Sequence, residues 1–144
     1  MTFADWTYVG VWAADTTYKH EGNAALLLKA NATAQRKNFS ATQLQIVFWA
    51  LCPAGNETPT VNLSSYGDLG FTPPSGWNKI RYTFWYDSTS DLRLGRKEKW
   101  DSSTNSWVKQ GDDVVFGTGA PSAGTLTLKS NGDIRWDDIY VYTT

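Results

Sequence analysis

Tryptophan side chains spaced among amide and guanidinium groups carry the clearest chemistry in this sequence. If two alternating apolar segments are strands, one side of each presents such groups, namely Gln43, Gln45 and Trp49 on the first and Arg81 and Trp85 on the second. Indole rings stack on the apolar C–H faces of sugars, and a few placed polar groups bind the hydroxyls. The pattern therefore predicts a carbohydrate-binding face, and the alternative is an ordinary solvated face of a sheet.

Two further tryptophans, Trp100 and Trp107, flank a polar segment at residues 101–106. The spacing predicts that they face each other across a hairpin, where a cross-strand aromatic pair stabilises the two strands. The alternative is an aromatic finger that contacts a ligand or another subunit. On that interpretation both residues join the predicted carbohydrate-binding set.

The sequence is poor in groups that catalyse reactions. It has one histidine, His20, and one cysteine, Cys52, whereas thiolate zinc sites and iron–sulfur clusters need several cysteines. Glycoside hydrolysis needs two carboxylates that flank the scissile bond. Glu57 lies in a loop rich in Pro and Gly, and Glu98 lies in a charge-alternating segment that we expect to be solvated. We therefore predict a protein that is not an enzyme, with His20 as a turn residue.

Length and charge indicate how many domains the chain forms and which partners it can have. The 144 residues suffice for one domain, 1–144, and 13 basic against 14 acidic side chains leave a formal net charge of -1. This balance argues against nucleic acid as a partner, and no apolar run reaches the roughly 18 residues of a membrane span. The first residues have neither a basic nor an apolar signal-peptide region, so no signal peptide is expected in this chain.

Alternating apolar residues and closely spaced turn residues predict an all-β protein. Strand-length segments of period two occur at 43–50, 79–87, 124–129 and 134–142, between clusters of Gly, Pro, Asn and Asp. Short strands at this spacing indicate an antiparallel two-sheet β-sandwich. A helix is conceivable only around residues 31–38, where a loop is the equal alternative.

Strict alternation also sorts the residues of the last segment. It places Asp137 with Ile139 and Val141 on one face, and Trp136, Asp138, Tyr140 and Tyr142 on the other. Asp137 would then point inward, where a carboxylate needs a partner. Four tryptophans at strand starts or beside apolar positions are expected in the core, namely Trp6, Trp12, Trp77 and Trp136.

Four short motifs follow one another along the chain. They run from His20-Glu21-Gly22 through Phe48-Trp49 and Gly76-Trp77 to the closing Trp136-Asp137-Asp138-Ile139. In this order they resemble jelly-roll carbohydrate-binding modules, of either the galactose-binding-like or the concanavalin-like lectin type. The resemblance implies jelly-roll topology and a structural Ca²⁺, an ion that takes six to eight oxygen ligands. The positions that match the calcium ligands of such modules are Asp137 and Glu21, with Asp5 as a further ligand.

Two functions from different classes remain open. The first is a non-catalytic module that binds a polysaccharide or cell-surface glycan through exposed tryptophans, outside the cell. The second is a virion-surface structural protein, such as a capsid decoration, fibre or adhesion module, which the expected lack of a signal peptide favours. The second predicts a homo-oligomer, often a trimer. Fold alone does not choose between them, because one fold serves many functions.

Overall fold

The computed structural model describes residues 3–39, 43–122 and 124–143. These residues form thirteen strands and one short 3-10 helix. The elements are η1 (Phe3–Asp5), β1 (Thr7–Val9), β2 (Trp12–Asp15), β3 (Ala25–Leu28), β4 (Thr33–Phe39), β5 (Gln43–Cys52), β6 (Thr60–Leu63), β7 (Gly67–Gly70), β8 (Gly76–Asp87), β9 (Leu92–Asp101), β10 (Ser106–Lys109), β11 (Val114–Thr118), β12 (Gly124–Lys129) and β13 (Ile134–Thr143). No helix in these ranges is long and apolar enough to cross a membrane.

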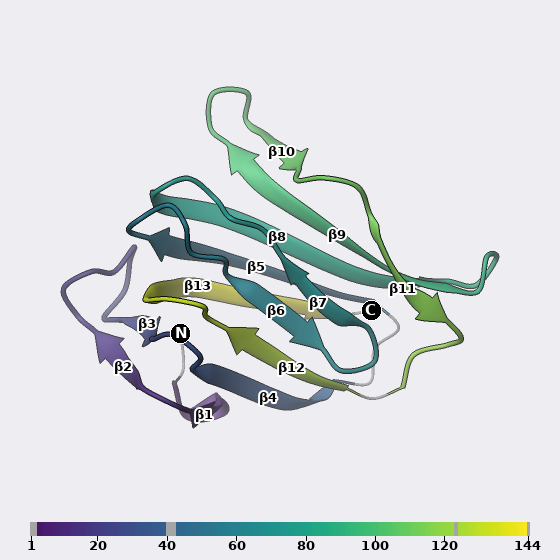
Figure 1. Ribbon diagram of the computed structural model, residues 1–144, viewed down its shortest axis with the longest axis horizontal. Helices are drawn as coiled ribbons and strands as arrows, with labels where there is room; N and C mark the ends of the chain where they lie inside the picture. The colour runs from purple at the N-terminus through teal and green to yellow at the C-terminus, as the bar shows by residue number, and fades with distance from the viewer. Residues whose placement is uncertain (1–2, 40–42, 123, 144) are drawn as a thin grey trace.

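The strands form two antiparallel sheets packed face to face, which confirms the predicted all-β jelly-roll sandwich. The smaller sheet has five strands in the order β1-β4-β12-β6-β7. The larger has eight, in the order β10-β9-β8-β5-β13-β3-β2, with β11 also paired to β9. Figure 1 shows the smaller sheet in front of β13 and β5, and the β9–β10 hairpin projecting beyond the sandwich at the top.

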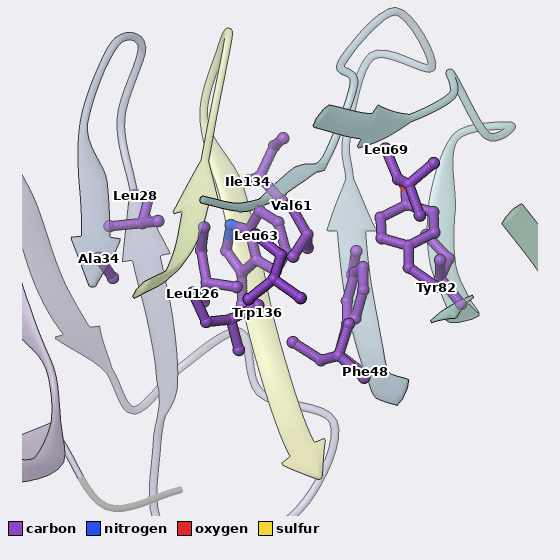
Figure 2. Packing of buried hydrophobic residues seen from close by; sticks show 14 of the residues in the cluster. Leu28, Ala34, Phe48, Val61, Leu63, Leu69, Tyr82, Leu126, Ile134 and Trp136 are labelled. Carbon is purple, nitrogen blue, oxygen red and sulfur yellow. The ribbon is translucent and has the colours of Figure 1, made fainter. Parts of the chain in front are cut away.

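Apolar residues of period two fill the space between the sheets. On β5 the residues Leu44, Ile46, Phe48 and Ala50 are buried, with Ile80, Tyr82 and Phe84 beside them on β8 and Leu126 and Leu128 opposite on β12. Figure 2 shows Phe48, Tyr82 and Trp136 packed among aliphatic side chains of both sheets. The polar atoms of Tyr82 and Trp136 are satisfied, because Tyr82 Oη donates to the Pro59 carbonyl and Trp136 Nε1 donates to Ser130 Oγ. The alternation thus fixes which side of each sheet faces outward.

The predicted faces of the last segment are wrong in part, because β13 contains a bulge. Asp137 pairs with Trp49 and Tyr140 with Val47, so three steps along β13 match two along β5. Asp138 lies at the extra residue with a positive φ of 50°. Trp136 therefore points into the core and Asp137 points to the outer face, where a loop covers it. After the bulge the sides reverse, so Ile139 and Val141 pack on the core and Tyr140 is exposed.

Two other expectations also need correction. Residues 31–38 form neither a helix nor a loop, because β4 occupies most of this range and pairs with both β1 and β12. Among the four tryptophans predicted for the core, Trp6 and Trp136 are buried and Trp77 is half-buried. Trp12 is 41% exposed, because β2 is the edge strand of the larger sheet and its indole stacks on Tyr8 at 4.0 Å instead.

Candidate functional site

The outer face of the larger sheet gathers most of the residues predicted to bind carbohydrate. Since β5 and β8 are neighbours, Gln43 lies opposite Trp85 and Gln45 lies opposite Thr83. A hollow of about 330 Å³ opens over these strands and β9. It is lined by Gln43, Gln45, Arg81, Thr83, Trp85, Arg96 and Glu98. The tertiary structure therefore brings Gln43, Gln45, Arg81 and Trp85 together in one cavity, at the lower end of the size range of ligand pockets.

Arg81 and Glu98 form one wall of this hollow. The Arg81 Nε and Nη2 atoms each donate to a Glu98 carboxylate oxygen at 2.9 Å. This bidentate pair joins β8 to β9 directly across the sheet, where the two residues are register partners. The sequence interpretation of Glu98 as a solvated residue was wrong, since its exposed fraction is 9%.

Arg96 and Asp113 form a second bidentate pair beside the first. Arg96 Nε and Nη2 donate to the Asp113 oxygens at 2.9 and 2.8 Å, and Lys109 Nζ lies 3.2 Å from the same carboxylate. These bonds, chiefly those from Arg96, lower the pKa of Asp113 to about 2. The Arg96 guanidinium also lies over Trp85, with Cζ at 5.2 Å from the ring centroid. Asp113 therefore stays ionised at neutral pH and holds Arg96 against the indole.

Trp100 and Trp107 form a cross-strand pair on the projecting hairpin. They are register partners on β9 and β10, with centroids 5.4 Å apart and rings inclined by 71°. Arg81 Cζ lies 4.4 Å from the Trp107 centroid, and Lys79 Nζ lies 5.6 Å from both rings. The cations thus occupy the ring surface toward β8. Neither tryptophan lines the hollow, and the pair continues the outer face beyond it.

Trp49 lies on the same outer face but outside the hollow. Its indole is stacked against the His20 imidazole, with centroids 3.9 Å apart and planes inclined by 15°. His20 also contacts Trp77 edge-on, at 5.6 Å between centroids. One face of the Trp49 ring is therefore covered by the loop between β2 and β3. The sequence offered no indication of this contact, because the two residues are far apart along the chain.

Asp137 holds that loop on the sheet. Its side chain is buried, and Oδ2 accepts the backbone N–H groups of His20 at 2.9 Å and Glu21 at 3.1 Å. The other oxygen, Oδ1, accepts the N–H of Asp138 at 2.9 Å. The predicted need of Asp137 for a partner is thus met by backbone donors. Both oxygens are engaged in hydrogen bonds with N–H groups, which leaves few lone pairs for a cation.

Of the carboxylates expected to bind a metal, Glu21 lies in a cluster with suitable donors. The cluster comprises His20, Glu21 and Asp138, whose ligand atoms all lie within 4.8 Å of one another. His20 Nδ1 and Asp138 Oδ2 are 2.8 Å apart. Asp5, in η1, is exposed and is not part of this cluster. Asp138 was assigned to the other side of the strand from the metal, and the bulge turns its side chain toward His20 instead.

Comparison with solved structures places the fold among known jelly rolls. The chain is similar to the cellulose induced protein Cip1, with a TM-score of 0.64 and 11% identity over 100% of this chain and 94% of that one. Weaker likenesses are to the CBM22-1 xylan-binding domain from Paenibacillus barcinonensis, with a TM-score of 0.45, 13% identity and coverage of 96% and 85%, and to peanut lectin, with a TM-score of 0.41, 10% identity and coverage of 97% and 93%.

Sequence comparison adds nothing to this result. No protein-family model matches the chain, and no curated protein matches it. At identities this low, the likeness to Cip1 is a likeness of fold. The jelly-roll fold implied by the motif resemblance is thereby confirmed, and what the chain binds has to be argued from its own site.

Proposed function

We propose that this protein is a non-catalytic carbohydrate-binding module that binds a polysaccharide or cell-surface glycan in the hollow on the larger sheet, outside the cell. The observation that carries the proposal is the meeting of Trp85 with Gln43, Gln45 and Arg81 in one cavity of about 330 Å³. An aromatic ring beside a few fixed polar groups is the arrangement that suits a sugar, which has apolar C–H faces and polar edges.

The carboxylates at the hollow favour binding without catalysis. A glycosidase needs one carboxyl group that can donate a proton to the leaving group. Asp113 has its pKa lowered to about 2 and so holds no proton at neutral pH. Each Glu98 oxygen accepts a hydrogen bond from Arg81, so this carboxylate is held against the guanidinium group. These groups are arranged to position arginines rather than to transfer protons.

The proposal is tested by measuring binding to a panel of immobilised plant, bacterial and animal polysaccharides. We expect retention on at least one of them and no release of reducing sugar from it. Competition by soluble oligosaccharides of the same polymer distinguishes a specific site from adsorption. If no polysaccharide binds, the proposed function is wrong, whatever the fold.

We also propose a structural Ca²⁺ at the loop between β2 and β3, held by Glu21 with Asp138 as the carboxylate of the closing strand. Support comes from their position in one cluster with His20. Asp137 and Asp5, the other predicted ligands, are less well suited, because Asp137 is engaged with N–H groups and Asp5 lies outside the cluster.

Removing calcium is expected to lower the melting temperature, because an ion that binds only the folded state stabilises it. The effect is about 1.4 kcal/mol when free ion is about ten times its dissociation constant. Thermal unfolding in Ca²⁺ and in chelator measures it, with Glu21→Gln as the variant that should lose the response. Identical melting of the wild type in both buffers would show that the cluster holds no calcium.

The alternative function, a virion-surface structural module, remains a prediction from the sequence. It is compatible with glycan binding, since a surface module also meets host glycans. Light scattering coupled to size exclusion addresses it through the oligomeric state, because a decoration module is expected to be a trimer. A monomer at working concentration would leave the binding module as the better interpretation.

A further inference from the structure

We infer that the glycan bound in the hollow is acidic, with a uronate carboxylate or a sulfate ester lying against Arg81 and Arg96. The inference rests on the proposed function and names its ligand class. It follows from the hydrogen-bonding groups that the hollow leaves unused, from the charge around it, and from the way Trp85 holds one of the arginines.

Both arginines keep one end of the guanidinium group available. Each pairs with its own carboxylate through Nε and Nη2, Arg81 with Glu98 and Arg96 with Asp113. Within the part of the chain that the structure describes, neither Nη1 atom makes a hydrogen bond, and both side chains line the hollow. A planar guanidinium with a fixed orientation and free N–H groups is well suited to a carboxylate or sulfate.

The remaining polar groups of the hollow also favour an acceptor-rich ligand. Gln45 Nε2 donates to Thr83 Oγ1 at 3.2 Å, so the Thr83 hydroxyl hydrogen is left to donate elsewhere. Each Glu98 oxygen already accepts one hydrogen bond from Arg81, which reduces the acceptor capacity that Glu98 offers to a ligand. Amide groups of Gln43 and Gln45 can serve neutral sugar hydroxyls. The donors that remain outnumber the acceptors, and an anionic oxygen is the group that satisfies them.

Positive charge exceeds negative charge at this end of the face. The cations Lys79, Arg81, Arg96 and Lys109 stand against the acids Glu98 and Asp113, where Asp113 is shared by Arg96 and Lys109. Among the described residues Lys79 has no ion-pair partner, and its ammonium lies over Trp100 and Trp107. Such a local excess attracts an anionic polymer although the whole chain has a net charge of -1.

Trp85 keeps Arg96 in position for this contact. The guanidinium lies over the indole with Cζ at 5.2 Å from the ring centroid, while Asp113 fixes its other edge. A stacked and bidentate arginine loses little side-chain entropy when it binds an anion, because its plane is already ordered. The same indole offers apolar contact to the sugar ring that bears the acid.

The test compares pairs of ligands that share a polymer backbone and differ chiefly in charge. Polygalacturonate and its fully methyl-esterified form share one backbone, and dextran sulfate and dextran form a second pair that separates sulfate from carboxylate recognition. Titration calorimetry should give at least about tenfold tighter binding for the charged member of one pair, the value of one charge-assisted hydrogen bond. That preference should shrink as NaCl is raised.

Matched variants locate the preference. Arg96→Gln should remove most of the preference for the charged ligand. Lys79→Gln should also reduce this preference, but by less. Arg135→Gln is the control, because Arg135 lies on the same sheet, pairs with Asp15 and does not line the hollow. Thermal unfolding of each variant checks that it is folded. If Arg96→Gln is not folded, Lys79→Gln is the variant that tests the charge preference.

The outcomes separate this inference from the proposed function. Equal affinity for the charged and the neutral member of each pair would overturn the inference and leave the carbohydrate-binding proposal in place. An equal loss in Arg135→Gln and Arg96→Gln would also overturn it, since it would indicate attraction by overall charge rather than by the hollow. No binding of any polysaccharide would contradict the proposed function itself.

Discussion

Replacing Asp137 by alanine is expected to lower the free energy of unfolding by about 3 kcal/mol. The reason is that the backbone N–H groups that now donate hydrogen bonds to the buried carboxylate would lose their acceptor. For a chain of this length the melting temperature should fall by about 10 °C. The donors are the N–H groups of His20, Glu21 and Asp138. Chemical denaturation measures the loss, and hydrogen exchange at residues 20–21 should show the loop opening.

Asp138→Asn provides the control for this substitution. Its carboxylate contacts the exposed His20 ring rather than buried N–H groups, and asparagine tolerates the positive φ of 50° at this position. With both variants measured in chelator, so that the proposed Ca²⁺ does not contribute, we expect a change below about 1 kcal/mol. Asp137→Asn should fall between the two, because one amide oxygen can still accept. If Asp137→Ala and Asp138→Asn unfold alike, the buried carboxylate does not anchor the loop.

Replacing Trp85 by alanine is expected to weaken glycan binding about tenfold to a hundredfold. The variant loses an indole ring whose burial against the sugar contributes about 1–3 kcal/mol of binding free energy. Loss of the indole also frees Arg96 from its cation–π contact. Titration with the polysaccharide that binds best in the panel measures the affinity. The melting temperature should change little, since Trp85 lies on the outer face and is only half-buried.

Trp12→Ala is the matched control, because Trp12 is also partly exposed but lies on the edge strand β2, away from the hollow. Its affinity should equal that of the wild type. Trp49→Ala tests whether Trp49, on the same predicted face, has the same role as Trp85. Because Trp49 packs on His20, this substitution should affect stability more than affinity. Wild-type affinity in Trp85→Ala would mean that the ligand binds elsewhere, and an unfolded Trp85→Ala would make Trp85 a core residue.

Period-two alternation decided much of the fold before any contact was known. Because successive side chains in a strand point to opposite faces, Leu44, Ile46 and Phe48 had to be buried together if β5 was a strand at all. The same period placed Gln43, Gln45, Arg81 and Trp85 on outward faces. Only the pairing of β5 with β8 was then needed to bring them into one hollow.

Period-two alternation could not predict a local irregularity such as the bulge in β13. One extra residue at Asp138 reverses the direction of every side chain after it in β13. Strict alternation therefore grouped Trp136 with Tyr140, whereas in the structure Trp136 and Ile139 face the core and Tyr140 faces outward. The sequence of this segment contains neither glycine nor proline to mark the bulge. The exposure of Trp12 was equally hidden, since an edge strand has the same composition as an inner one.

The sequence by itself determined the strands at 43–50, 79–87 and 124–129, their apolar faces and the aromatic and polar character of the outer surface, because these depend on residues close together in the chain. The tertiary structure alone decided which distant groups meet. Asp113 reaches Arg96 because β10 and β11 both fold back on β9, and His20 covers Trp49 because Asp137 on the closing strand holds its backbone. Such contacts depend on register and loop path, and no periodicity in the sequence encodes either.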